Sequence, residues 1–154
     1  MLIAVDFDGV IVGQDRPYAD VTTPLQLMPY AKEGLESLKR AGHTILLYSA
    51  RANRALLFTP EWDPLVRAGV RRPHEAAWGQ AKALHWARFH QMQEFVTAEL
   101  PGLIDAIDDG LQGKPMADLF IDDRSFEFGL GAKGWTDLMT LYGAHPQAHG
   151  GRHG

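Results

Sequence analysis

Short, mostly apolar runs that end directly in acidic or hydroxyl side chains constrain the fold of this chain more than any other feature. The first run covers residues 2–5 and stops at Asp6. A continuous apolar run of this length predicts a strand that is buried on both faces. Similar runs at 44–48, 103–107 and 119–121, apolar apart from Thr44 and Asp105, stop at a serine or an aspartate. The sequence therefore predicts several buried strands.

Helices are predicted between these strands. Pro29 can open a helix that Gly42 ends, and further helices are predicted over 74–99 and 135–141. Strands that alternate with helices predict an α/β fold, here a Rossmann-like open parallel sheet covered by helices on both faces. Right-handed crossovers bring the carboxyl ends of all strands to one edge, where such sheets bind ligands.

The composition is that of a single globular domain. The chain has 154 residues, and we expect one domain over 1–143 followed by a disordered tail, 144–154, rich in Gly and His. The spacing of His145, His149 and His153 could suggest a metal site, but a solvated tail is favoured. The absence of cysteine excludes disulfides, thiolate metal sites and a cysteine nucleophile.

Charge and hydropathy narrow the class of partner. With a formal net charge of -4, the chain lacks the strongly basic surface that is typical of nucleic-acid-binding domains. A local basic patch would still be compatible with this charge. No apolar run approaches the roughly 20 residues that span a bilayer. No membrane association is therefore expected, and residence in the cytoplasm is predicted.

The strongest chemical signal is the pair Asp6 and Asp8, which follows the first strand with Phe7 between. Carboxylates two residues apart can project to the same side, and like charges so close favour a bound cation. Hard Mg²⁺ prefers such oxygen ligands. A turn rich in Asp that merely caps the strand is the plain alternative.

Three more signals follow later strands or lie in loops. Ser49 follows the second strand and could donate to a phosphoryl oxygen, while Arg51 could add charge or orient a carboxylate. Lys114 lies in a loop and could neutralise a phosphate. Asp122 and Asp123 directly follow the strand at 119–121 and repeat the pattern of the first strand.

The order Asp-x-Asp, Ser, Lys, Asp-Asp resembles the four motifs of the haloacid dehalogenase (HAD) superfamily. The segment Ala-Asp-Leu-Phe-Ile-Asp-Asp-Arg, with a lysine shortly before it, is similar to small capless phosphatases of that superfamily. The likeness covers residues 1 to about 141, and 53–100 match poorly. No insertion after Asp8 or Ser49 is large enough for a full cap domain.

This resemblance implies a Mg²⁺-dependent phosphatase that hydrolyses a phosphomonoester through an aspartyl-phosphate. It implies that Asp6 is the nucleophile and Asp8 the general acid and base, since dehalogenases of the superfamily lack the second aspartate. The implied phosphate-binding residues are Ser49, Arg51 and Lys114, and the implied metal ligands are Asp6, Asp8, Asp122 and Asp123.

Several alternatives stay open. Asp108 and Asp109 also follow an apolar run, with Lys82 upstream as a second candidate for the motif lysine, but Asp122 has the better flanking match. A HAD phosphotransferase would share every motif. A phospho-receiver signalling module uses similar residues in a different order.

The substrate class is left broad by the sequence. We expect a phosphorylated small molecule, a nucleotide or a nucleic-acid end, and an oligomer is compatible with the sequence. Residues 53–73 contain four arginines and Trp62, which could contact a nucleotide, although an ordinary exposed connection is favoured.

Overall fold

The computed structural model describes residues 1–14, 16–52, 68, 75–110, 114–122 and 132–144. Four parallel strands form one sheet in the order β3-β2-β1-β4. Their bounds are β1 Leu2–Val5, β2 Thr44–Leu47, β3 Ala106–Ile107 and β4 Leu119–Ile121. The predicted parallel α/β sheet is confirmed, although β3 covers only the end of its predicted run.

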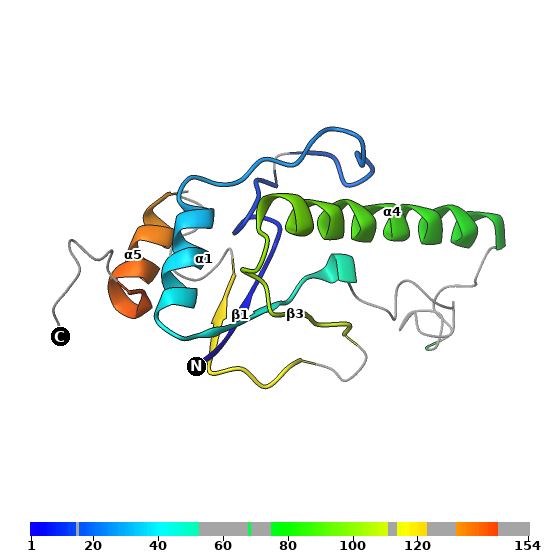
Figure 1. Cartoon of the computed structure of the whole chain (residues 1–154). Helices are drawn as coiled ribbons and strands as arrows, with labels where there is room; N and C mark the ends of the chain where they lie inside the picture. The colour runs from blue at the N-terminus through cyan, green and yellow to red at the C-terminus, as the bar shows by residue number, and fades with distance from the viewer. Residues whose placement is uncertain (15, 53–67, 69–74, 111–113, 123–131, 145–154) are drawn as a thin grey trace, which may run out of the picture.

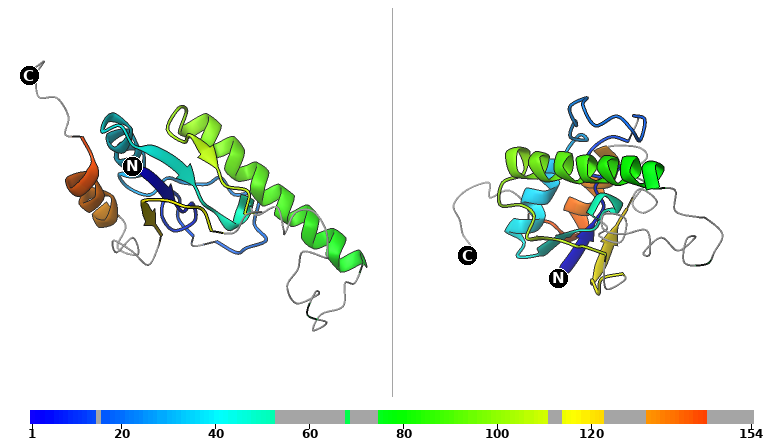
Figure 2. Two further views of the ribbon diagram at one scale, coloured as in Figure 1. Left: turned by 90° about the horizontal axis from the view of Figure 1, so that it is seen from below. Right: turned by 90° about the vertical axis from the view of Figure 1, so that its right-hand side faces the viewer.

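The helices lie close to their predicted positions. Their bounds are α1 Ala31–Arg40, the short 3₁₀ helix η1 Ala50–Ala52, α4 Glu75–Glu99 and α5 Ala132–Tyr142. Helices α1 and α5 pack side by side. Helix α4 lies apart from this pair and extends beyond the sheet (Figures 1 and 2). No helix among these described segments is long and apolar enough to cross a membrane.

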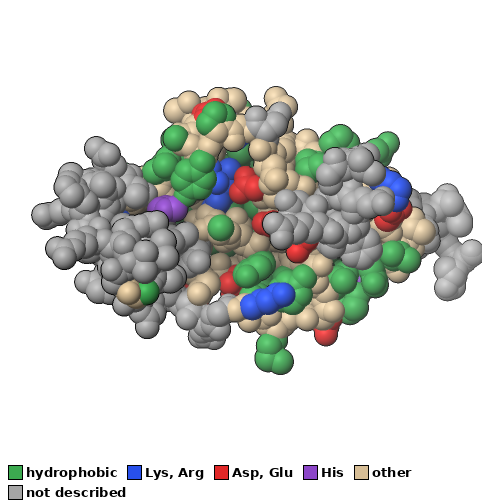
Figure 3. Space-filling view, turned by 180° about the vertical axis from the view of Figure 1, so that it is seen from behind, with side chains coloured by type: hydrophobic (Ala, Val, Ile, Leu, Met, Phe, Trp, Pro, Cys, Tyr) green, Lys and Arg blue, Asp and Glu red, His purple; other side chains and the backbone are tan. Residues whose placement is uncertain are grey.

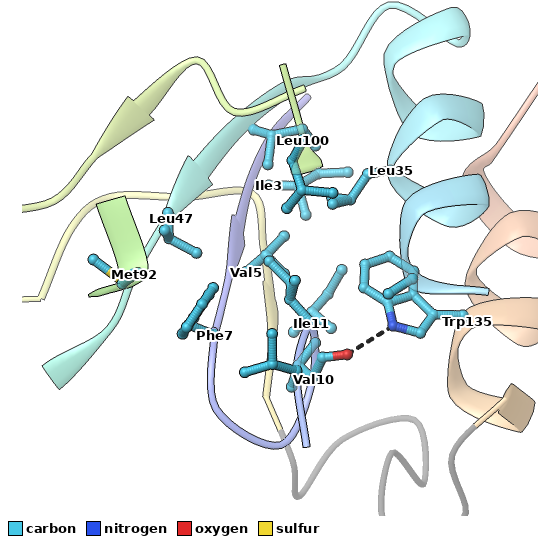
Figure 4. Packing of buried hydrophobic residues seen from close by; sticks show 14 of the residues in the cluster. Ile3, Val5, Phe7, Val10, Ile11, Leu35, Leu47, Met92, Leu100 and Trp135 are labelled. Carbon is cyan, nitrogen blue, oxygen red and sulfur yellow. Dashed lines mark hydrogen bonds between the residues drawn. The ribbon is translucent and has the colours of Figure 1, made fainter. Parts of the chain in front are cut away.

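The hydrophobic core lies on one face of the sheet, which we call the first face. Because side chains alternate along a strand, this face carries Ile3 and Val5 of β1 with their neighbours on β2 and β4. All three α-helices contribute buried side chains to the same cluster. Figure 4 shows them converging on Ile3, Val5 and Phe7.

The opposite, second face differs from the sequence expectation of helices on both sides. It carries Leu2, Ala4, Leu46 and Phe120, and none of these belongs to the core cluster. The physical reason is the connection from β3 to β4, which spans only 108–118. Parallel strands need a dozen or more residues for a helical crossover. In the described part of the chain, helices therefore pack against the first face alone.

Trp135 of α5 ties the end of the chain to the loop after β1. Its ring is fully buried, and its Nε1 donates a hydrogen bond of 2.8 Å to the carbonyl of Val10 (Figure 4). The ring lies directly against Gly34 of α1, where an added Cβ would come within 2.2 Å of Trp135 Cε3. The closing helix thus fixes the loop that begins with the predicted catalytic pair.

Candidate functional site

The four strands end level with one another. Val5 is paired with Leu47 on one side and with Ile121 on the other, and Leu47 is paired with Ile107. The ladder continues one step further, because the amides of Asp6, Tyr48 and Asp108 each donate a 2.9 Å hydrogen bond to the neighbouring strand. The next residues therefore form a row along this edge, in the order Asp108, Tyr48, Asp6, Asp122.

This row separates the two acidic candidates. Adjacent strands lie about 4.8 Å apart, so Asp6 and Asp122 are direct neighbours, whereas Asp108 lies two strands from Asp6. The order in which the chain forms the strands also distinguishes Asp122 from Asp108. The chain passes from β1 to β2 and β3 on one side and then returns to place β4 on the other side of β1. Open α/β sheets bind ligands at such a switch point, here between β1 and β4.

The carboxylate of Asp6 lies on the second face of the sheet. Val5 and Phe7 on either side of it are fully buried in the core cluster, so alternation directs Asp6 the other way. The Phe7 amide donates a 2.7 Å hydrogen bond to Asp6 Oδ1 and fixes the side chain. On the side of the molecule shown in Figure 3, acidic, basic and hydrophobic side chains lie next to one another.

A tight turn follows and places Asp8. The amide of Gly9 donates to the Val12 carbonyl at 2.8 Å, and that of Ile11 to the Phe7 carbonyl at 2.9 Å. Gly9 has φ of 84°, which a side chain would strain. Asp8 therefore stands at the entrance of a tight turn, between the core side chains of Phe7 and Val10.

Arg51 holds the carboxylate of Asp8 in a two-pronged ion pair. Its Nε donates to Asp8 Oδ2 and its Nη2 to Asp8 Oδ1, both at 2.8 Å. The side chain of Arg51 is 1% exposed and that of Asp8 26%. Arg51 Nη1 also donates to the carbonyl of Arg88 and to Gln91 Oε1. The contact matches the sequence hypothesis that Arg51 orients a carboxylate.

A second arginine, Arg88, joins this network and was missed by the sequence reasoning. Its Nη2 lies 3.9 Å from Asp8 Oδ2, and its Nη1 donates to the Tyr18 carbonyl at 2.8 Å. Its guanidinium stacks over the Tyr18 ring at 3.9 Å. Burial lowers the pKa of Arg88, as does Arg51 beside it, whereas Asp8 raises it. Arg88 and Gln91 lie on one helical face, but this spacing alone does not distinguish a buried ion-pair partner from a solvated side chain.

Helix α4 and the loop of residues 16–24 are joined through the same region. The Tyr18 hydroxyl contacts His85 Nδ1 at 2.7 Å, and Gln91 Nε2 donates to the Thr23 carbonyl at 3.1 Å. Burial lowers the pKa of His85, and the charge of Arg88 lowers it further. The network therefore fixes α4 and the loop around Asp8.

The remaining predicted residues have different surroundings. Ser49 is buried, and its Oγ accepts a 3.2 Å hydrogen bond from the Arg51 amide, so it caps η1; its hydroxyl proton could still be donated elsewhere. Lys114 is exposed, with its Nζ 4.2 Å from the centroid of the Phe120 ring. Asp123, the basic stretch 53–67 and 69–73, and the tail 145–154 lie outside the described residues.

The described residues fit a magnesium ion. Asp6 and Asp122 offer carboxylate oxygens from adjacent strands on one face, and Mg²⁺ commonly takes one or two carboxylates and keeps several waters. No group of three His, Cys, Asp or Glu close enough to hold a metal occurs in the described part of the chain. A site with few protein ligands and several waters is the kind that this donor set can form.

No protein-family model matches the chain, and neither the curated proteins nor the solved structures contain a match.

Proposed function

We propose that this chain is a Mg²⁺-dependent phosphatase of the HAD type, without a full cap domain, that hydrolyses a phosphomonoester through an aspartyl-phosphate. One observation carries the proposal: Asp6 and Asp122 are level on adjacent strands at the switch point of a parallel sheet. The motif resemblance depends on the order of residues along the chain and not on the order of strands in the sheet, so this register supports it independently.

The proposed first step is attack of an Asp6 carboxylate oxygen on phosphorus. A new Asp6 O–P bond forms while the P–O bond to the alcohol breaks, and Asp8 gives its proton to the leaving alkoxide. Bound Mg²⁺ would supply charge neutralisation between the carboxylates and the phosphoryl oxygens. Ser49 and Lys114 are proposed to donate hydrogen bonds to those oxygens, which helps positioning.

In the proposed second step, water attacks phosphorus and releases phosphate from Asp6. Asp8, now a carboxylate, takes the proton of that water. The ion pair with Arg51 suits this second step, because it holds Asp8 as a carboxylate in one orientation and occupies two of its roughly four lone-pair sites. For the first step, Asp8 must first take up a proton from solvent. Arg51 is thus proposed to be a positioning residue, and Arg88 reinforces it.

Phosphate release tests the function. Wild-type protein with Mg²⁺ should release inorganic phosphate from a generic phosphomonoester over many turnovers, whereas a receiver module would accept a single phosphate. Asp6→Asn should abolish turnover and keep the fold, because the amide is nearly isosteric but a poor nucleophile. Asp137→Asn, an exposed change on α5, is the matched control. Normal turnover by Asp6→Asn would sink the proposal.

The second candidate is a phosphotransferase that passes the phosphoryl group from Asp6 to an alcohol. The candidate site favours water as the acceptor, because Asp6 lies on the second face, where no helix of the described part packs. Product analysis with an added alcohol distinguishes the two.

A further inference from the structure

Two aromatic rings stand beside Asp6 on the second face of the sheet. Tyr48 is level with Asp6 on the neighbouring strand, and Phe120 lies on β4 in register with Ala4. Their ring centroids are 6.0 Å apart, and the planes meet at 74°. Tyr48 and Phe120 therefore form a pair on the same side of the sheet as the proposed nucleophile.

The small side chain of Ala4 allows this pair to form. Tyr48 and Phe120 belong to strands on opposite sides of β1, whose axes are about 9.6 Å apart, yet their rings meet. The rings must lean toward each other across β1. Ala4 lies between them and is only 1% exposed, although it is not part of the core cluster. The pair thus covers β1 one step before Asp6.

Tyr48 is the ring of the pair that is open to solvent, and a cation lies next to Phe120. Tyr48 is 37% exposed, and Lys114 Nζ lies 4.2 Å from the Phe120 centroid. Because the planes of the two rings meet at 74°, a flat ring of a ligand could stack on only one of them, and Tyr48 is the exposed one. The ammonium group of Lys114 adds attraction for an anionic ester. The plain alternative is a surface aromatic pair that only shields Ala4.

We propose that Tyr48 and Phe120 form a platform that binds a planar aromatic ring in the alcohol part of the substrate. This inference rests on the proposed phosphatase function, since it is Asp6 that places the phosphate next to the platform. The substrate class is then a phosphomonoester that carries a ring, such as a nucleoside monophosphate or a simple aryl ester, in preference to a sugar or alkyl phosphate.

The test measures ligand binding, so that it does not depend on catalysis. Dissociation constants are determined by calorimetry with Mg²⁺ for phenylphosphonate against butylphosphonate, which cannot be hydrolysed. A second arm compares adenosine 5′-monophosphate with ribose 5-phosphate, using Asp6→Asn if the wild type consumes them. Stacking of one ring should give about 5- to 150-fold tighter binding of the ring-bearing member of each pair.

Three variants locate this preference. Tyr48→Leu should reduce it to nearly one, Tyr48→Phe should retain it, and Leu141→Ala, an exposed change on α5, should leave it unchanged. A preference in both arms indicates any aromatic ring, and one in the nucleotide arm alone indicates a nucleobase. Equal binding of both members by the wild type, or a preference that survives in Tyr48→Leu, would overturn the platform. Absence of phosphate release from every ester would instead refute the phosphatase function, and the binding preference would still be measurable.

Discussion

Replacement of Asp122 and of Asp108, one at a time, tests where the proposed metal binds. Two oxygens that share one Mg²⁺ lie at most about 4.2 Å apart, because each Mg–O distance is about 2.1 Å. Asp6 and Asp122 project from adjacent strands about 4.8 Å apart on one face, which allows this separation. Asp108 is about 9.6 Å from Asp6, with Tyr48 between them in the row.

Asp122→Asn should therefore raise the Mg²⁺ concentration needed for half-maximal activity by at least about 10- to 100-fold. This range is the loss of metal affinity typical of removing an outer hydrogen-bond partner of a ligand, so loss of a direct ligand should be no smaller. Asp108→Asn should leave the Mg²⁺ requirement nearly unchanged. Asp108 Oδ2 accepts a 3.1 Å hydrogen bond from the Gly110 amide, and an asparagine oxygen can keep that bond.

Two assays check this ranking. The first is activity against Mg²⁺ concentration for both variants. The second is the rise in melting temperature with Mg²⁺, which reports binding to the folded state without catalysis. If Asp108→Asn weakened Mg²⁺ binding more than Asp122→Asn in both assays, the metal would belong to β3, the register argument would be refuted, and Lys82 would again be a candidate for the motif lysine.

Three further predictions concern the acid, the core and the sheet edge. Asp8→Asn should slow aspartyl-phosphate formation about 10²- to 10⁴-fold on an alkyl ester and less on a nitrophenyl ester in single-turnover kinetics, because the phenolate needs little protonation; equal losses would refute the acid role. Gly34→Ala should destabilise the protein by about 1–3 kcal/mol in urea unfolding, since its Cβ would come within 2.2 Å of the buried Trp135 ring, whereas an unchanged midpoint would mean that the ring can move. Burial raises the pKa of Asp105, but hydrogen bonds from the Ile45 amide and from Lys39 outweigh burial and hold the pKa below its usual value. The stability lost in Asp105→Asn should therefore be evident above about pH 4, measured by urea unfolding, and should vanish as the pH falls through the lowered pKa.

The elements of the fold were largely predictable from the sequence. The run at 119–121 matches β4, and the predicted long helix begins one residue before Glu75 and ends where α4 ends. Apolar runs and helical spacing report burial directly, which explains this agreement. The one-sided core was not predicted, because strand periodicity shows that both faces are apolar and does not show which face the helices cover.

The candidate site was predictable in part for a similar reason. Strand ends identify Asp6 and Asp122 as residues of one edge, but only the strand order makes them neighbours and moves Asp108 away. The sequence left two roles open for Arg51, adding charge to a phosphate site or orienting a carboxylate, and its ion pair with Asp8 matches the second. Arg88 was missed, because an arginine within a long helix has no local pattern that distinguishes a buried ion-pair partner from a solvated side chain.

The position of β1 in the sheet has a consequence for how the protein is made. β1 leaves the ribosome well before its partner β4, which begins at Leu119, and before Trp135, which holds the loop after β1. At about 5–20 residues per second, translation of the intervening chain takes roughly 6 to 24 s. During this interval one edge of β1 has no partner strand, and the proposed metal ligands Asp6 and Asp122 cannot meet. The enzyme activity proposed for this chain should therefore appear only after β4 has been made, and truncation before β4 should abolish it.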